Sequence, residues 1–188
     1  MAPRDTSRKP PRPLDERRLE ELAVSYVGRF ATTRARLGAY LGRKLRERGW
    51  EGKAAPATEA LVERLAGLGY IDDAAYALSK ARSLGQRGYG GGRVTMALRT
   101  AGIGEDDGRA AQDFSREQSV AAAVRFAQRR RIGPFAMEKG GPEQRQKALA
   151  AMVRAGHAFE LARAIVALEP DRSPDPEEIA DRLSYLQR

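Results

Sequence analysis

Apolar residues recur along most of the chain at intervals of three and four residues, the spacing that places side chains on one face of an α-helix. Leu37, Tyr40, Leu41 and Leu45 form one such stripe, and Gly49 follows where the helix is expected to end. No stretch alternates apolar and polar residues with the period of two that a half-buried strand shows, and no β-branched run is bounded by hairpin turns. The pattern predicts an all-α fold.

The same progression of elements occurs three times along the chain. An apolar-periodic helix, a basic turn and a second helix are followed each time by a glycine and a bulky residue, namely Gly49-Trp50, Gly102-Ile103 and Gly156-His157. Even spacing of this kind indicates a repeat, in which stacked units bury apolar surface against their neighbours. We therefore predict three related helical units over residues 19–68, 69–114 and 115–168. A disordered basic arm over residues 1–18 precedes them, and an acidic helical tail over residues 169–188 follows.

Acidic residues cluster where helices are expected to begin. The clusters are Asp72-Asp73, Glu105-Asp106-Asp107 and Glu177-Glu178. A carboxylate in the first turn satisfies free N–H groups and the helix dipole, so we interpret these acids as caps and first-turn residues, not as a metal site or a catalytic pair. Thr32 and Thr33, Pro142 and Asp175-Pro176 mark further helix starts, and Ser115-Arg116-Glu117-Gln118 resembles a capping box that opens the third unit.

Composition excludes several classes of protein. The chain has 188 residues, of which 41% are hydrophobic and 31% charged, and it contains no cysteine. Disulfides, thiol nucleophiles and zinc knuckles are thereby excluded. No apolar run approaches the roughly 18 residues of a spanning helix, and the basic N-terminus lacks a following apolar segment typical of secretory signals. We expect a cytoplasmic protein, without a membrane partner and without a cofactor.

Positive charge is concentrated in the body of the chain. The net charge is +9, and because residues 159–188 carry seven acids and four arginines, that segment is −3 and the first 158 residues are +12. A basic body of this kind indicates a polyanion or an acidic protein face as partner. The alternative is an arginine-rich surface that is simply solvated.

Basic residues recur beside the expected inter-helix turns of all three units, and we predict that stacking would bring them into one continuous strip. The candidate contact residues are Arg34, Arg36, Arg43 and Lys44 in the first unit, Lys80, Arg82, Arg87, Tyr89 and Arg93 in the second, and Arg129, Arg130, Arg131 and Arg145 in the third.

The glycine-rich stretch over residues 88–92 does not indicate a nucleotide site. A phosphate cradle requires a preceding strand and usually a Lys-Ser/Thr pair at the start of the helix, and neither is present. We interpret the stretch as a tight turn whose backbone, with Arg87 and Arg93, is able to approach a partner closely. No nucleophile motif is present, so an enzyme is not expected.

Most aromatic residues fall on apolar stripes and are expected in the core. They are Tyr26, Phe30, Tyr40, Tyr76, Phe126 and Phe159. Tyr89 is the exception, since its position in a basic glycine turn leaves two roles open, stacking on a base or insertion into a protein pocket. His157 is expected to pack, because it occupies the place of Trp50 and Ile103 in the other units.

The centre of the chain resembles a known family. The run Leu68-Gly69-Tyr70-Ile71-Asp72-Asp73-x-x-Tyr76-Ala77, followed by Arg82, Gly88-x-Gly90, Arg93-Val94, Leu98 and Gly102-Ile103, resembles the central signature of the RecX family of bacterial recombinase regulators. The similarity extends more weakly over about residues 19–168.

The resemblance implies tandem three-helix repeats in an elongated, curved, solenoid-like array. It also implies a negative regulator that inserts into the groove of the RecA nucleoprotein filament and restrains ATP hydrolysis and strand exchange. Contact with single- or double-stranded DNA is attributed to the family, and we expect a monomer. The third unit departs from the pattern through its longer loop over residues 132–141.

Two other functions remain open from the sequence. A three-helix unit is able to present a recognition helix to a groove, so a stand-alone nucleic-acid-binding module is the first alternative. A purely structural helical scaffold is the second, and it predicts no interaction with either RecA or DNA.

Overall fold

The structure, a computed structural model, describes residues 12–187, and its contacts divide the chain into two compact units with the boundary between Asp72 and Asp73. Every regular element in these residues is helical, and the β-bridge between Leu14 and Trp50 stands alone outside any strand. The prediction of an all-α fold is confirmed. Within residues 12–187, the helices fall short of the length and apolarity that crossing a membrane takes.

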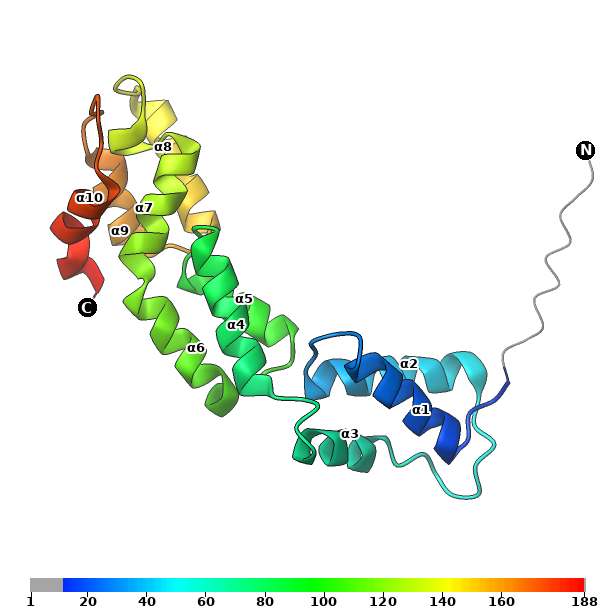
Figure 1. Ribbon diagram of the computed structural model, residues 1–188. Coiled ribbons are helices and arrows are strands. Elements are labelled where there is room, and N and C mark those ends of the chain that lie inside the picture. Colours follow the sequence, from blue (N-terminus) through cyan, green and yellow to red (C-terminus); the bar gives the residue numbers. More distant parts are fainter. Residues whose placement is uncertain (1–11, 188) are drawn as a thin grey trace, which may run out of the picture. The chain divides into compact units, whose positions relative to one another are not determined.

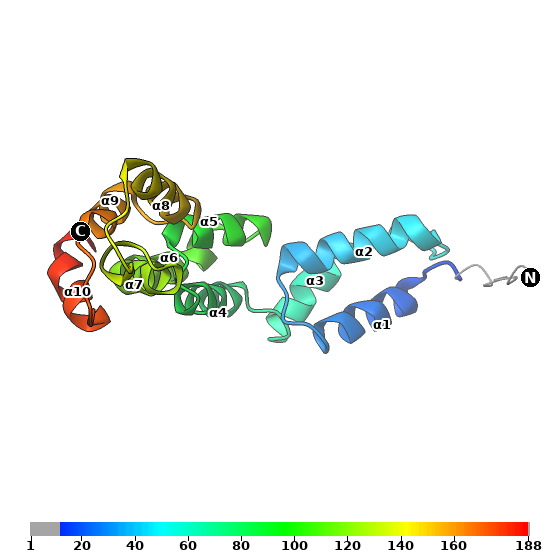
Figure 2. The same cartoon turned by 90° about the horizontal axis from the view of Figure 1, so that it is seen from above.

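In the first unit, α1 (Glu16–Val27), α2 (Arg34–Arg48) and α3 (Thr58–Gly67) pack around one apolar cluster (Figures 1 and 2). Thr33 begins α2 as predicted, because its Oγ1 accepts a hydrogen bond from Arg36 N at 3.2 Å. Gly49 ends the helix with φ 78°, a conformation that favours glycine. The predicted stripes supply the buried side chains of the cluster, which include Leu19, Ala23, Leu37, Leu41, Leu61, Val62 and Leu65.

The segment before α1 differs from the predicted disordered arm. Leu14 is 0% exposed, its N donates to Gly49 O at 3.0 Å, and Glu51 N donates to Leu14 O at 2.8 Å. The Asp15 carboxylate caps α1 by accepting from Arg18 N at 2.8 Å. The prediction of disorder is wrong for residues 12–18, since a buried leucine and a helix cap hold them in place. The rest of the predicted arm, residues 1–11, lies outside the described residues.

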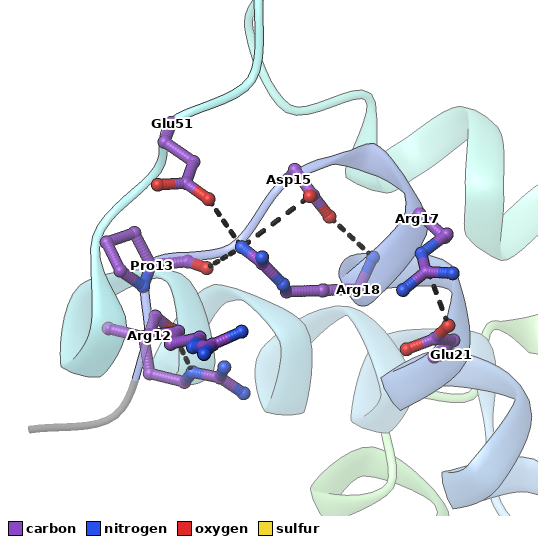
Figure 3. A network of polar contacts seen from close by, with 8 residues as sticks. Arg12, Pro13, Asp15, Arg17, Arg18, Glu21 and Glu51 are labelled. Atoms are coloured by element: carbon purple, nitrogen blue, oxygen red, sulfur yellow. Dashed lines mark hydrogen bonds and ion pairs between the residues drawn. The ribbon is translucent and has the colours of Figure 1, made fainter. Parts of the chain in front are cut away.

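Two arginines fasten this segment to the first unit. Arg18 Nη1 donates to Pro13 O at 2.8 Å and to a carboxylate oxygen of Glu51 (Figure 3). Arg48 Nε donates to Arg12 O at 2.8 Å. The hydrogen bond to Glu51 raises the pKa of Arg18. Residues 12–14 are thus held to the C-terminal end of α2 by backbone and side-chain bonds together.

Over residues 73–187, the second unit contains seven α-helices, α4 (Asp73–Gln86), α5 (Gly91–Thr100), α6 (Glu105–Glu117), α7 (Ser119–Arg130), α8 (Pro142–Arg154), α9 (Phe159–Ala167) and α10 (Pro176–Leu183) (Figure 1). Two short 3-10 helices, η1 (Gly133–Phe135) and η2 (Ser184–Gln187), accompany them. One apolar cluster lies among α4, α5 and α6, and a second lies among α7, α8, α9 and α10. The partly buried Tyr89 packs against both clusters. The division of the chain into repeats at the predicted boundaries stays a prediction.

Several predicted helix boundaries are confirmed in the second unit. Pro142 is the first residue of α8, and the Asp175 side chain accepts from Glu177 N at 2.8 Å at the start of α10. Asp73 lies in the first turn of α4, directly after Asp72, and the other two acidic clusters lie in the first turns of α6 and α10. Gly102 and Gly156, which precede the bulky residues of the repeat pattern, have φ values of 70° and 93°. The left-handed stop inferred from these glycines is therefore present.

The capping box predicted at Ser115 is wrong. Ser115 lies inside α6, which continues to Glu117, and α7 begins at Ser119 after the single residue Gln118. Gln118 N donates to Phe114 O at 3.0 Å, so the backbone satisfies its own groups across the break. No side-chain cap is required where one helix follows another this directly.

Candidate functional site

The glycine turn between α4 and α5 contacts another turn of the same unit. Gly90 N donates to Ala155 O and Gly92 N donates to Gly156 O, both at 3.0 Å. A Cβ on Gly90 would lie 2.6 Å from His157 N and closer still to Gly156 O. Only a residue without a Cβ allows this approach. The interpretation that the turn's backbone faces a partner is wrong at Gly90, because the surface that it approaches is the chain's own α8–α9 turn.

Arg87, Tyr89 and Arg93 lie together at this turn. The guanidinium carbons of Arg87 and Arg93 are 5.7 Å and 5.9 Å from the centre of the Tyr89 ring, within the range of cation–π attraction. Tyr89 is partly buried, whereas both arginines are exposed. Two exposed guanidinium groups therefore lie against the ring of Tyr89, which is itself partly buried by packing.

The basic candidates of the second unit are not neutralised. None of the eight makes an ion pair with a carboxylate in the described part of the chain, and all but one are exposed. They are Lys80, Arg82, Arg87, Arg93, Arg129, Arg130, Arg131 and Arg145. Other arginines of the same unit are paired, since Arg109 bonds to Asp106 at 2.9 Å and Arg116 to Asp113 at 2.8 Å. The candidates thus carry positive charge that is free to attract an external anion.

The basic candidates of the first unit are more heavily paired. Arg34 lies 3.3 Å from a carboxylate oxygen of Glu63, and Glu47 is shared by Lys44 at 2.6 Å and Arg43 at 3.5 Å. The hydrogen bond from Lys44 lowers the pKa of Glu47. Arg36 lies one helical turn before Tyr40 on α2 and is partly buried. Whether these cations continue a strip that includes the second unit stays a prediction.

An aromatic row beside these cations was missed by the sequence interpretation, which assigned its members to the core. Tyr26 and Tyr40 stack with ring centres 4.3 Å apart, and Phe30 lies 5.3 Å from Tyr26. Arg43 and Lys44 approach the Tyr40 ring at 5.6 Å and 6.0 Å. Phe30 is 56% exposed, because it lies beyond the last turn of α1. Its spacing of four residues from Tyr26 was the available signal for a shared face.

Two other aromatic residues test the same expectation in the second unit. Phe126 is buried, as predicted, and Arg130 lies 5.8 Å from its ring. Phe159 is 54% exposed, so the prediction that it belongs to the core is wrong. It is the first residue of α9, where the helix does not yet face the cluster that Leu161 and Ile165 reach.

His157 is buried, as its position in the repeat pattern predicted. Its side chain is 5% exposed, its ring lies 5.4 Å from the Phe126 ring, and Nε2 is 3.1 Å from Gly88 O. Burial lowers the pKa of His157 to about 4. The imidazole is therefore neutral at pH 7, with Nε2 as the donor to the carbonyl, and it joins the α4–α5 turn to the α8–α9 turn. Within residues 12–187, no cluster of histidine and acidic residues forms a metal site.

The fold and these side chains define the chain as an all-α protein with an arginine-rich surface that is only partly neutralised. Over 170 residues it is 34% identical to Regulatory protein RecX of Myxococcus xanthus (strain DK1622), and the alignment covers 86% of this chain and 91% of that protein. The chain belongs to the RecX family of regulatory proteins, as its central signature indicated.

Solved structures agree with the fold. A crystal structure of regulatory protein RecX matches with a TM-score of 0.62 and 23% identity, over 80% of this chain and 70% of that one. The crystal structure of RecX from Lactobacillus salivarius matches with a TM-score of 0.62 and 17% identity, over 80% of this chain and 93% of that one. No family model matches the chain.

Proposed function

We propose that this protein is a negative regulator of the RecA recombinase, which binds in the groove of the RecA–DNA filament and restrains its ATPase and strand-exchange activity. The observation that supports the proposal most directly is the alignment with a RecX regulatory protein over 91% of that protein's length. We further propose that it acts in the cytoplasm as a monomeric binding protein and not as an enzyme.

The charge of the second unit supports an acidic or phosphate-bearing partner. Eight candidate cations lack carboxylate partners among the described residues, and Arg87 and Arg93 both lie against the ring of Tyr89. Guanidinium groups bind carboxylates and phosphates through paired, charge-assisted hydrogen bonds. Such a surface suits acidic patches of a recombinase, the phosphates of its DNA, or both.

The proposed mechanism is bridging of successive RecA subunits. One body that touches neighbouring subunits would resist the changes in subunit spacing that accompany ATP turnover. The backbone contact between the α4–α5 and α8–α9 turns supports this mechanism, because it joins the α4–α6 and α7–α10 helices of the second unit without a flexible linker. A rigid body transmits resistance that two loosely linked groups of helices would not.

The test is inhibition of DNA-stimulated RecA ATPase by the double variant Arg87→Ala, Arg93→Ala. We expect the concentration for half-maximal inhibition to rise by about tenfold, equivalent to about 1.4 kcal/mol of binding free energy. The matched control is Arg109→Ala, Arg116→Ala, which removes the same charge from arginines that are already paired with Asp106 and Asp113. Equal inhibition by wild type and the first variant would exclude the α4–α5 turn as a contact surface.

A second candidate function, stand-alone binding of nucleic acid, is favoured by the aromatic row in the first unit. Bases of a single strand stack on exposed aromatic rings, and neighbouring cations track the backbone. Phe30 offers an exposed ring, and Arg43 and Lys44 lie at the other end of the row beside Tyr40. This arrangement suits a single strand better than a duplex, whose bases are already stacked.

The dependence of binding affinity on salt concentration distinguishes the two functions. Binding dominated by duplex phosphates loses affinity with a log–log slope of roughly −0.9 for each phosphate neutralised, and roughly −0.7 on a single strand. Affinity for a labelled oligonucleotide alone and affinity for the RecA filament are therefore measured across the same salt range. A filament affinity that falls with the same slope as the affinity for DNA alone would favour the nucleic-acid module.

A further inference from the structure

A cavity of about 260 Å³ opens beside the long loop that joins α7 to α8. That loop, α8 and the C-terminal end of α9 form its walls. Ile132, Ala148 and Val166 contribute to an apolar lining, and Met137, which also lines the cavity, is 86% exposed. Small-molecule sites are usually larger, at roughly 300–1,000 Å³. The space therefore suits one or two side chains of a partner protein, and exposed methionine is typical of such surfaces.

Charged side chains surround the apolar lining. Lys139 pairs with Glu169, so their charges offset each other. Arg131 and Arg145 line the same cavity, are exposed, and make no ion pair with any residue in the described part of the chain. Glu138 is the remaining charged residue of the lining. The lining is therefore net positive, with two guanidinium groups that have no carboxylate.

The loop is fixed in place before any partner arrives. A Cβ on Gly133, whose φ is 59°, would overlap Ile165 O of α9, and Asp171 N donates to Pro134 O at 3.0 Å. Arg131 has φ 53°, a left-handed conformation that only a few per cent of non-glycine residues adopt. Helices commonly end with glycine at such a position. Strained backbone of this kind clusters at binding sites, so the arginine at this position points to a role for its guanidinium outside folding.

The acidic helix α10 packs away from the cavity, whose lining contains none of its residues. Ile179 and Leu183 of α10 are buried in the cluster of α7, α8 and α9, so this helix is packed on the second unit. No carboxylate among the described residues pairs with Arg131 or Arg145, so both guanidinium groups are available to a carboxylate of another molecule.

We propose that the cavity binds a protein segment in which an apolar side chain stands next to an aspartate or glutamate. The apolar side chain enters between Ile132, Ala148 and Val166, and the carboxylate accepts hydrogen bonds from Arg131 and Arg145. This site goes beyond the proposed regulation of RecA and does not depend on it, although Arg131 and Arg145 are also among the eight cations considered for that function. It lies on the loop that sets the third predicted unit apart from the other two.

The test uses the full ¹⁵N-labelled chain and a short capped peptide with leucine and phenylalanine flanked by aspartates. We expect chemical-shift changes confined to amides of the loop, α8 and α9, at peptide concentrations up to about 1 mM. A peptide with serines in place of leucine and phenylalanine, and one with lysines in place of the aspartates, are each expected to bind at least about tenfold more weakly.

Variants of the chain locate the site. The double variant Arg131→Gly, Arg145→Gln removes both guanidinium groups, and Ala148→Leu fills the cavity, and each is expected to weaken binding by about tenfold or more. Arg154→Gln is the matched control, because Arg154 is exposed on the same helix but does not line the cavity. Arg131→Gly relieves a left-handed arginine, so loss of binding with unchanged melting temperature is not a folding defect.

Four results would overturn the proposal. The first is an absence of shift changes in the loop at the highest peptide concentration, and the second is equal affinity for Arg131→Gly, Arg145→Gln and for wild type. The third is a concentration-dependent shift of the same amides without peptide, since the occupant would then be a second copy of the chain. Retained affinity in the Ala148→Leu variant would likewise place the peptide elsewhere.

Discussion

Replacement of Gly90 by alanine tests the contact between the α4–α5 and α8–α9 turns. Gly90 has φ −84° and ψ 175°, which alanine adopts without strain, so the backbone conformation itself is no obstacle. The added Cβ would lie 2.6 Å from His157 N and closer to Gly156 O. Both neighbours are backbone atoms, which cannot rotate aside as a side chain would. The two turns must therefore separate.

The cost of Gly90→Ala follows from the parts of this contact. Insertion of a methyl group into a closely packed site costs about 1–3 kcal/mol. Separation of the turns also weakens the hydrogen bonds from Gly90 N to Ala155 O and from Gly92 N to Gly156 O, each worth about 0.5–1.5 kcal/mol. Alanine also lowers the conformational entropy of the unfolded chain relative to glycine, which stabilises the folded state by about 0.4–1 kcal/mol. We expect a net loss of about 2–5 kcal/mol in the free energy of unfolding.

The assay is urea unfolding of the full chain, followed by circular dichroism and by fluorescence. Trp50 is the only tryptophan and lies in the first unit, so its fluorescence reports that unit, whereas circular dichroism reports helices of both. The control is Gly85→Ala in α4, where a Cβ would meet nothing within 4 Å and the free energy of unfolding should stay equal or rise by up to about 1 kcal/mol. A Gly90→Ala urea midpoint, followed by circular dichroism, that equals the wild-type midpoint would refute the packing argument.

Three further predictions follow from buried or exposed side chains. His157 has a folded pKa of about 4, below its unfolded value of about 6.5, so the unfolded chain binds more protons between these values. The free energy of unfolding should therefore fall by up to about 3 kcal/mol as pH drops from about 6.5 to 4. In a His157→Gln variant, the urea midpoint should no longer fall over this pH range through His157. Leu14→Ala should cost about 2–5 kcal/mol and shift the Trp50 fluorescence transition, whereas an unmoved transition would mean that residues 12–14 do not hold the first unit together. Phe30→Ala should weaken binding of a labelled single strand by about tenfold without changing the slope of its salt dependence. The control is Phe159→Ala, a similarly exposed phenylalanine whose loss should not weaken binding. Equal losses in the two variants would exclude the aromatic row as the binding site.

The sequence predicts best those features that repeat with the helix period. Stripes such as Leu37 and Leu41 identified the helices, and capping chemistry placed the starts at Thr33 and Pro142. Leu14 was missed because a single apolar residue among prolines and arginines has no period. Its burial depends on the segment after α2, where Gly49, Trp50 and Glu51 pair with it. Phe30 was placed in the core because periodicity assigns a face to a residue without showing where the neighbouring helices end.

Contacts between turns far apart in the chain left no local signal. The sequence showed that the turn around Gly90 is permissive, but the identity of the backbone it approaches depends on how α8 and α9 fold over α7. The sequence identified the candidate cations by their density near turns. Which of them form ion pairs with carboxylates could be seen only in the structure. Arg34 and Lys44 have carboxylate neighbours, whereas Arg87 has none among the described residues.

Most of the family signature in this chain is explained by packing. Ile71 and Leu98 are buried in apolar clusters, and Gly90 is required by the close approach of two turns. Arg82 and Arg93 are different, because both are exposed and neither has a carboxylate partner among the described residues. Within residues 12–187, their guanidinium groups make only cation–π contacts, with Phe114 and Tyr89, so we propose that their place in the signature reflects contact with a partner. Within the second unit, these two arginines are therefore stronger candidates for the proposed RecA–DNA contact than Arg129 or other cations outside the signature.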